Sequence, residues 1–194
     1  MRSNIPKVLA IIAGKPILHH VLETCQQVTS ENCIVIGGYQ FEVLKGSIDP
    51  HFKVDWKYQE QQLGTAHAVG LALDSLSDGD IAIILTGDVP LISSQTLQSL
   101  AKVCSASQMG IVTQHLLDPS GYGRIKRNQH EEIVGIVEHK DASADELEIS
   151  EINTGIMAIP GAFLKEALPK IGNDNVQEEY YLTDIIELAV QSGI

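Results

Sequence analysis

The strongest constraint on the fold is a five-residue apolar run, Ile81 to Leu85, that stands between two helix-like segments. Asp80 precedes this run, and Thr86-Gly87-Asp88 follows it. A short apolar run with turn residues at both ends is typical of a buried strand. Strands that alternate with helices favour a parallel sheet whose two faces are covered by helices.

The first hundred residues continue this alternation. Helical periods are expected at 16–28, 41–48, 64–76 and 93–103, and strands at 33–36 and 52–58. The pattern then changes, because strand-like runs at 110–117, 121–126 and 132–139 are separated by turn residues. A strand at 156–159 and helices at 162–168 and 182–190 complete the chain. We therefore expect one α/β domain over 1–194, with a mostly parallel sheet and a small antiparallel excursion.

Composition narrows the class of protein. The net charge of −12 disfavours a nucleic-acid partner, whose phosphates require a basic surface. No run approaches the roughly 20 apolar residues of a membrane span. The start of the chain lacks the apolar segment of a secretory signal. Three cysteines without CxxC spacing read as buried thiols in a reducing compartment, which predicts a cytoplasmic protein.

Gly87-Asp88 is the first candidate site, because it directly follows the strongest strand. In open parallel sheets, ligands bind outside the carboxyl ends of the strands. A carboxylate there can hold Mg²⁺, which often takes one or two carboxylates together with substrate phosphates. The alternative is an ordinary turn, and the dipeptide alone favours the turn.

The second candidate is the polar segment from Gln59 to Ala66, which leads into an expected helix. A glutamine amide offers a donor and an acceptor, which suits the pairing edge of a base such as uracil. The alternative is a solvated loop in which Thr65 caps the helix, and the two interpretations are evenly balanced. Lys7, taken alone, is a surface lysine. Ala13-Gly14-Lys15-Pro16 lacks the glycines of a phosphate-binding loop, so we reject that interpretation.

A third group of polar residues follows the middle strands. Asparagine, glutamate and a tight glycine backbone are what the hydroxyl and amide groups of a sugar need. The group comprises Gly121-Tyr122-Gly123-Arg124, Glu138-His139-Lys140-Asp141 and Glu151-Ile152-Asn153-Thr154-Gly155. Each of these residues taken singly is more typical of a hairpin turn or an exposed charge.

Taken together, the motifs resemble one family. Its members are the bacterial bifunctional N-acetylglucosamine-1-phosphate uridyltransferases and glucosamine-1-phosphate acetyltransferases. The resemblance covers nearly the whole chain and rests on motifs that occur in the family's order. They are Pro6-Lys7-Val8-Leu9, Ala13-Gly14-Lys15-Pro16, Gln62 to Ala68, Gly87 to Leu91, Gly121 to Ile125, Ile136-Val137-Glu138, Glu151 to Gly155 and Glu179 to Asp184.

The resemblance implies a Rossmann-like nucleotidyltransferase fold and Mg²⁺-dependent attack of N-acetylglucosamine 1-phosphate on the α-phosphorus of UTP. It implies that Lys7 contacts phosphates and that Gln59 and Gly64 read uracil, with Thr65 beside them. Gly87 and Asp88 would lie at the substrate, with Asp88 as the Mg²⁺ ligand. The residues implied to hold the N-acetylglucosamine moiety are Gly123, Glu138 and Asn153.

The sequence also departs from the family pattern. The family opens with a strand and a glycine-rich loop, Leu-Ala-Ala-Gly-x-Gly-Thr-Arg-Met, whose methionine would fall at Met1. Family members also carry a later asparagine, which is a second Mg²⁺ ligand, and a hexapeptide-repeat acetyltransferase domain. In the family pattern, both come after the position of Ile194. We therefore expect impaired activity and self-association through exposed strand edges. Two alternatives stay open: a non-catalytic fragment that binds a nucleotide sugar, and a nucleotidyltransferase for another sugar 1-phosphate, which Glu138 and Asn153 disfavour.

Overall fold

The computed structural model describes residues 5–29 and 33–194. The chain forms two compact units, each of which is described on its own. The first unit is Met1–Gln62 with Leu85–Ser99, and the second is Leu63–Ile84 with Leu100–Ile194. The expectation about the first three residues lies outside the described residues.

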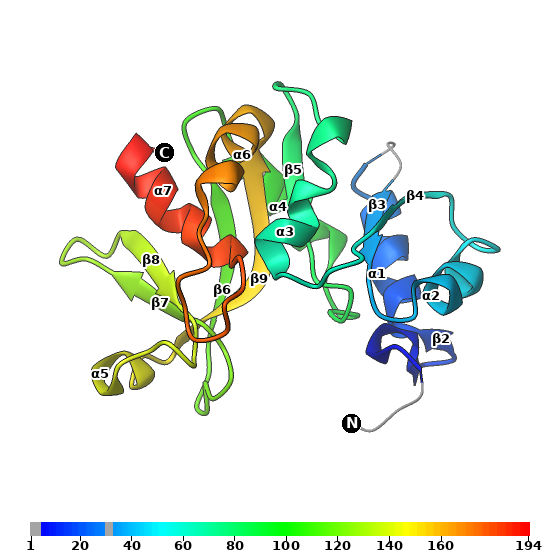
Figure 1. Ribbon diagram of the computed structural model, residues 1–194, viewed down its shortest axis with the longest axis horizontal. Helices are drawn as coiled ribbons and strands as arrows, with labels where there is room; N and C mark the ends of the chain where they lie inside the picture. Colours follow the sequence, from blue (N-terminus) through cyan, green and yellow to red (C-terminus); the bar gives the residue numbers. More distant parts are fainter. Residues whose placement is uncertain (1–4, 30–32) are drawn as a thin grey trace. The chain divides into compact units, whose positions relative to one another are not determined.

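The first unit is built around a pair of parallel strands (Figure 1). These strands, β3 (Cys33–Gly37) and β4 (Val54–Tyr58), pair in register along their whole length. Apolar side chains of α1 (Ile17–Gln26) and α2 (Phe41–Ile48) share one buried cluster with residues of both strands. The predicted strand–helix alternation is confirmed here, because each expected element occurs within two residues of its predicted bounds.

A hairpin precedes α1. After the 3₁₀ helix η1 (Lys7–Leu9), strand β1 (Ile11–Ile12) pairs antiparallel with β2 (Lys15–Pro16). The two turn residues, Ala13 and Gly14, have φ values of 49° and 84°. Two-residue hairpins require such positive φ angles to match the twist of their strands. The segment is therefore a tight hairpin, and the rejection of a phosphate-binding loop is confirmed.

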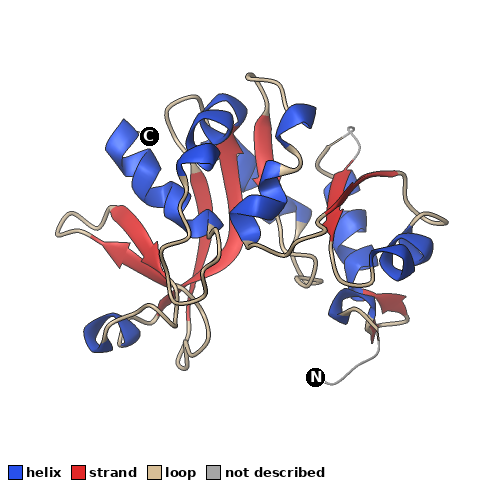
Figure 2. Cartoon of the chain, in the orientation of Figure 1, coloured by secondary structure: helices blue, strands red, loops and turns tan. Residues whose placement is uncertain are grey.

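The second unit is built on a five-stranded antiparallel sheet (Figure 2). The strand order is β5-β9-β7-β8, and β6 also pairs with β9. The strands are β5 (Ile81–Ile84), β6 (Gly110–His115), β7 (Arg124–Arg127), β8 (Ile133–Val137) and β9 (Glu151–Pro160). The helical elements are α3 (Thr65–Gly70), η2 (Leu73–Ser75), α5 (Ala144–Leu147), α6 (Gly161–Ala167), η3 (Leu168–Lys170), η4 (Leu182–Asp184) and α7 (Ile185–Ser192). Helix α4 (Ser94–Val103) contributes residues to both units.

The α/β class is confirmed, but the antiparallel part is larger than expected. Strand β5, which we expected within a parallel sheet, pairs antiparallel with β9, from Ile81 opposite Pro160 to Ile84 opposite Met157. Within residues 5–29 and 33–194, β3–β4 is the one parallel pair. An apolar run shows that a strand is buried, but it carries no signal for the direction of its partner.

Two other elements differ in length from the prediction. Strand β9 has 10 residues, because its polar first half, Glu151 to Gly155, also pairs with β6. The helix expected over 64–76 is instead split, with α3 ending at Gly70 and η2 following it. Glycine weakens a helix interior by about 1 kcal/mol relative to alanine, which accounts for the break.

Helices α6 and α7 complete the second core. Helix α7 packs against β8, and α6 packs against β9 (Figure 1). Their apolar faces meet the sheet at residues that include Met157, Leu164 and Ile185, each with an exposed fraction of 1% or less. This packing holds the ends of β7, β8 and β9 in fixed relation to the start of α7.

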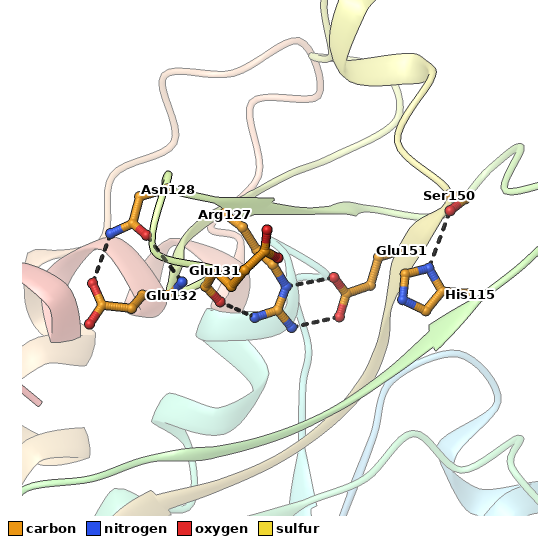
Figure 3. A network of polar contacts seen from close by, with 7 residues as sticks. All are labelled: His115, Arg127, Asn128, Glu131, Glu132, Ser150 and Glu151. Carbon is orange, nitrogen blue, oxygen red and sulfur yellow. Dashed lines mark hydrogen bonds and ion pairs between the residues drawn. The ribbon is translucent and has the colours of Figure 1, made fainter.

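A network of polar side chains links strands β7 and β9 of this sheet (Figure 3). Arg127 of β7 donates two hydrogen bonds, each of 2.8 Å, to the two carboxylate oxygens of Glu151 on β9. A third bond runs from Arg127 Nη1 to the backbone oxygen of Glu131. The guanidinium holds the pKa of Glu151 well below its usual range, at about 2. The network therefore ties β7 to β9 beside the segment that carries Asn153.

Candidate functional site

In the first unit, Lys7 and Asp88 lie in direct contact. Lys7 Nζ stands 2.5 Å from Asp88 Oδ2, although 81 residues separate the two in sequence. The hydrogen bond from Lys7 lowers the pKa of Asp88; burial opposes the shift, and a hydrogen bond from Thr86 adds to it. Asp88 is therefore ionised near neutral pH. About a third of its side chain remains exposed, so a ligand can reach it.

Gly87 allows this segment to pack closely. A Cβ atom at this position would lie 3.3 Å from Val8 Cγ1 and 3.4 Å from Leu18 Cδ1. Both neighbours belong to the cluster of apolar residues around α1, and Val8 directly follows Lys7. The small residue therefore lets the chain bring Asp88 alongside the segment that carries Lys7.

Gln59 lies at the carboxyl ends of the two parallel strands. It directly follows β4, and its backbone N–H donates to the oxygen of Gly37, the last residue of β3, at 2.8 Å. At the neighbouring Gly38, a Cβ would lie 3.1 Å from both the Gln59 backbone oxygen and the Gln62 amide nitrogen. This edge is where parallel sheets bind ligands.

Gly64 and Thr65 belong to the second unit. Gly64 is the N-cap of α3 with a φ of 115°, and a Cβ there would lie 2.5 Å from the backbone oxygen of Tyr180. Only glycine fits such a backbone approach. Thr65 does not cap the helix, because its hydroxyl oxygen accepts the backbone N–H of Leu182 at 2.9 Å. The loop is therefore bound to a segment more than 100 residues later in the chain.

Gly123, Glu138 and Asn153 meet at one place in the second unit. A Cβ on the buried Gly123 would lie 3.3 and 3.4 Å from the two carboxylate oxygens of Glu138. The backbone N–H of Asn153 donates to the Gly123 oxygen at 2.9 Å. Residues 30 positions apart in sequence are thus brought together.

A bulge in β9 sets the position of Asn153. The register with β6 shifts between Val112 and Thr113, which pair with Ile156 and Asn153, respectively. The two extra residues include Gly155, with a φ of 77°, whose N–H donates to Asn153 Oδ1 at 2.9 Å. Bulges re-aim side chains at the edges of sheets, and this one holds the side-chain oxygen of Asn153 against the Gly155 N–H.

Two residues beside Glu138 were not assigned a role from the sequence. Thr183, with 5% of its area exposed, donates a hydrogen bond from its hydroxyl to Glu138 Oε1 at 3.0 Å. Burial raises the pKa of the neighbouring Asp184 to about 6, and nearby carboxylates, chiefly Glu187, add to the shift. Both residues lie in the Glu179 to Asp184 motif, so that motif could have indicated them as site residues.

The side chains at Lys7 and Asp88 offer one carboxylate ligand for a metal ion. Asp88 offers an ionised, partly exposed carboxylate, which is the kind of oxygen that Mg²⁺ prefers. Over the described ranges 5–29 and 33–194, no group of three or more His, Cys, Asp or Glu residues could hold a metal ion by itself. Mg²⁺ commonly combines one or two carboxylates with water and substrate phosphate oxygens, so a single carboxylate such as Asp88 fits this chemistry.

The fold and these clusters define a class, and comparison with known proteins names it. Residues 1–124 match the family described as the MobA-like NTP transferase domain. The match covers more than half of the chain, including Lys7, Gln59, Asp88 and Gly123. The chain belongs to this nucleotidyltransferase family.

Two curated relatives are similar to this chain along its whole length. The chain is 48% identical, over all 194 residues, to the bifunctional protein GlmU of Aromatoleum aromaticum. It is 46% identical, also over its whole length, to the bifunctional protein GlmU of Acinetobacter baumannii. It spans 42% of the length of each of these relatives. The similarity therefore concerns one part of a longer, two-function protein.

Solved structures agree on the fold. A UDP-glucose pyrophosphorylase complexed with UDP-glucose matches 97% of this chain and 80% of its own, with a TM-score of 0.72 and 18% identity. A putative glucose-1-phosphate thymidylyltransferase of Bacillus anthracis matches 97% of this chain and 75% of its own, with the same TM-score and identity. The nucleotidyltransferase fold is thus confirmed. No helix within the described residues is long and apolar enough to cross a membrane.

Proposed function

We propose that this chain, as a nucleotidyltransferase domain over 1–194, transfers the uridylyl group of UTP to N-acetylglucosamine 1-phosphate. The products would be UDP-N-acetylglucosamine, a precursor for cell-wall synthesis, and pyrophosphate. The observation that carries the proposal is the convergence of Gly123, Glu138 and Asn153, which the resemblance assigns to the sugar. Similarity to one part of bifunctional GlmU proteins, over the whole of this chain, supports the same activity.

The sugar residues offer complementary groups. The Glu138 carboxylate accepts hydrogen bonds from sugar hydroxyl groups, and the Asn153 side chain can donate from its amide nitrogen. Burial raises the pKa of Glu138, while the hydrogen bond from Thr183 opposes the shift. Because Gly123 lacks a Cβ, Ile136 and the Glu138 carboxylate can lie against its backbone. Gln59, at the end of the parallel strands, and the Gly64-Thr65 backbone would read the uracil.

Lys7 and Asp88 would serve the phosphates. A phosphate oxygen of the sugar phosphate attacks the α-phosphorus of UTP, and the bond to the β-phosphate breaks, so that pyrophosphate leaves. Such transfers rest on positioning and on charge stabilisation rather than on a protein nucleophile. Lys7, which pairs with Asp88 in this structure, can donate to a nucleotide phosphate instead. Mg²⁺ held by Asp88 and substrate phosphates would neutralise charge on those phosphates.

Release of pyrophosphate from UTP and N-acetylglucosamine 1-phosphate, with and without Mg²⁺, tests the activity. Asp88→Asn should lower the rate by about 10²–10³, the usual cost of one preorganised electrostatic group, and leave the thermal midpoint nearly unchanged. Asp78→Asn, which removes an exposed partner of Lys165, is the matched control and should keep the wild-type rate. Near-normal turnover by Asp88→Asn would remove Asp88 from the site. Binding of UDP-N-acetylglucosamine without turnover would favour the non-catalytic alternative.

Base choice has its own test. Gln59→Ala should reduce the preference for UTP over CTP, because the pairing edge of uracil, which differs from that of cytosine, loses its hydrogen-bond partner. Gln95→Ala changes an exposed glutamine of α4 and should leave the preference intact. If both variants kept the wild-type preference, uracil would be read elsewhere. We also propose a cytoplasmic location, which the three free cysteines support.

A further inference from the structure

The Glu179 to Asp184 segment joins two parts of the proposed site. Its residue Tyr180 donates its backbone N–H to the oxygen of Leu63 at 2.8 Å and accepts from the N–H of Ala66 at 2.9 Å. Leu182 donates its N–H to the hydroxyl oxygen of Thr65 at 2.9 Å. The segment therefore runs alongside the loop from Leu63 to Ala66, held by three hydrogen bonds.

One residue further on, the chain reaches Glu138. Thr183 lies in η4, next to the end of β8, and its side chain is buried with 5% of its area exposed. Its hydroxyl donates to Glu138 Oε1 at 3.0 Å, across 45 residues of sequence. A buried threonine has few rotamers, so its donor comes from a fixed direction.

The surroundings of Glu138 make this donor important. Asp184 and Tyr181 interact electrostatically with Glu138, but the like charge that acts on Glu138 itself is that of Asp141. Burial and this like charge favour the protonated form of Glu138, whereas a hydroxyl donor favours the ionised form. An ionised, oriented carboxylate can accept two hydrogen bonds from a sugar, and a protonated carboxyl group accepts less strongly.

We propose that Thr183 is a positioning residue for sugar recognition. Its hydroxyl holds the Glu138 carboxylate ready to accept hydrogen bonds from the sugar phosphate, and the backbone bonds of Tyr180 and Leu182 anchor Thr183 to the Leu63–Ala66 loop. This inference rests on the proposed function only in that Glu138 contacts the sugar. No direct contact between Thr183 and substrate is required.

The test compares Thr183→Val, which keeps the shape and removes the hydroxyl, with Thr183→Ser, which keeps the hydroxyl. Thr183→Val should raise the KM for N-acetylglucosamine 1-phosphate about tenfold, the effect of losing one hydrogen bond to a charged group, and leave the KM for UTP within about twofold. Thr183→Ser should restore most of the sugar affinity. Thr24→Val removes a hydroxyl of α1 that donates to the His20 oxygen and serves as the matched control.

A second measurement does not depend on turnover. Carboxyl-carbon NMR of selectively labelled glutamate follows the titration of Glu138, with Glu138→Gln identifying the signal. Thr183→Val should raise the pKa of Glu138 further, and Thr183→Ser should not. An unchanged titration together with an unchanged sugar KM would overturn the inference.

The two proposals fail in different ways. If the wild-type chain neither binds nor converts either substrate, the proposed function fails, while the Glu138 titration still judges whether Thr183 holds the carboxylate. If the wild type is active but Thr183→Val raises both KM values equally, Thr183 has only a structural role. If Thr183→Val lowers the thermal midpoint more than Thr24→Val does, the KM of Thr183→Ser for the sugar phosphate and the Glu138 titration decide whether Thr183 positions the carboxylate.

Discussion

The ion pair between Arg127 and Glu151 leads to a prediction for stability. We expect Glu151→Gln to destabilise the chain at pH 7, because glutamine keeps the shape but loses the charge that faces the guanidinium (Figure 3). Only 8% of the Glu151 side chain is exposed, so water cannot replace the lost interaction well. Breaking the bond also weakens the link between β7 and β9.

The magnitude follows from the pKa. Glu151 has a pKa of about 2 against an ordinary value of 4.5. At about 1.4 kcal/mol for each pKa unit, the ionised form could contribute at most about 3–4 kcal/mol to the free energy of unfolding. Because 32% of the Arg127 side chain is exposed to screening by solvent, we expect a loss of about 1–2 kcal/mol.

The pH dependence has a definite sign. A depressed folded-state pKa stabilises the protein fully above the ordinary value of 4.5, and this stabilisation is lost as the pH falls from 4.5 towards 2. At pH 3, roughly two fifths of it should remain. The difference between wild type and Glu151→Gln should therefore shrink from pH 7 to pH 3.

Urea denaturation followed by circular dichroism at both pH values measures this difference. Glu166→Gln is the control, because Glu166 pairs with Lys170 on an exposed helix surface, and its removal should leave the midpoint unchanged. Equal midpoints for wild type and Glu151→Gln at pH 7, or a difference that persists undiminished at pH 3, would refute the assignment.

Three further predictions concern single residues. Asp184 has a pKa raised to about 6, so its ionised form lowers the free energy of unfolding at pH 8. Asp184→Asn should therefore stabilise the chain by about 1–2 kcal/mol at pH 8 and not at pH 3.5, and equal urea midpoints at pH 8 would contradict this. Gly64→Ala should lower the midpoint more than Gly121→Ala, because both have positive φ but only the first places a Cβ 2.5 Å from a backbone oxygen. A hydrogen bond with Cys25 lowers the pKa of Cys33, so Cys33 should react with iodoacetamide at pH 7 faster than the other cysteines, as mass spectrometry would show.

Much of the local structure could be predicted because it depends on neighbouring residues. The apolar period after Pro16 predicts α1, which begins at Ile17 with Pro16 as its N-cap. The hydroxyl of Ser93, directly before α4, caps the helix by accepting the N–H of Thr96 at 3.1 Å. Candidate site residues were found where strands end, since Gln59 directly follows β4 and Asp88 follows β5 after a short turn. These signals come from a few adjacent residues, so the sequence carries them directly.

The strand pairing and strand directions in the sheet of the second unit could not be predicted from the sequence and became clear only from the tertiary structure. The first half of β9 is polar, and its pairing with β6 depends on a bulge at Gly155 that no local pattern announces. The direction of β5 was also hidden, because an apolar run fits parallel and antiparallel partners equally well.

The sequence by itself determined which chemical groups this chain can offer: the amide of Gln59, the carboxylates of Asp88 and Glu138, and the glycines that allow close approach. The tertiary structure decided which of them meet. Lys7 reaches Asp88 across 81 residues, and Thr183 reaches Glu138 across 45. Such contacts arise from packing between distant segments, whose hydrogen bonds form only after the cores have placed the backbones. Local sequence patterns encode the donors and acceptors, whereas the fold encodes their pairing.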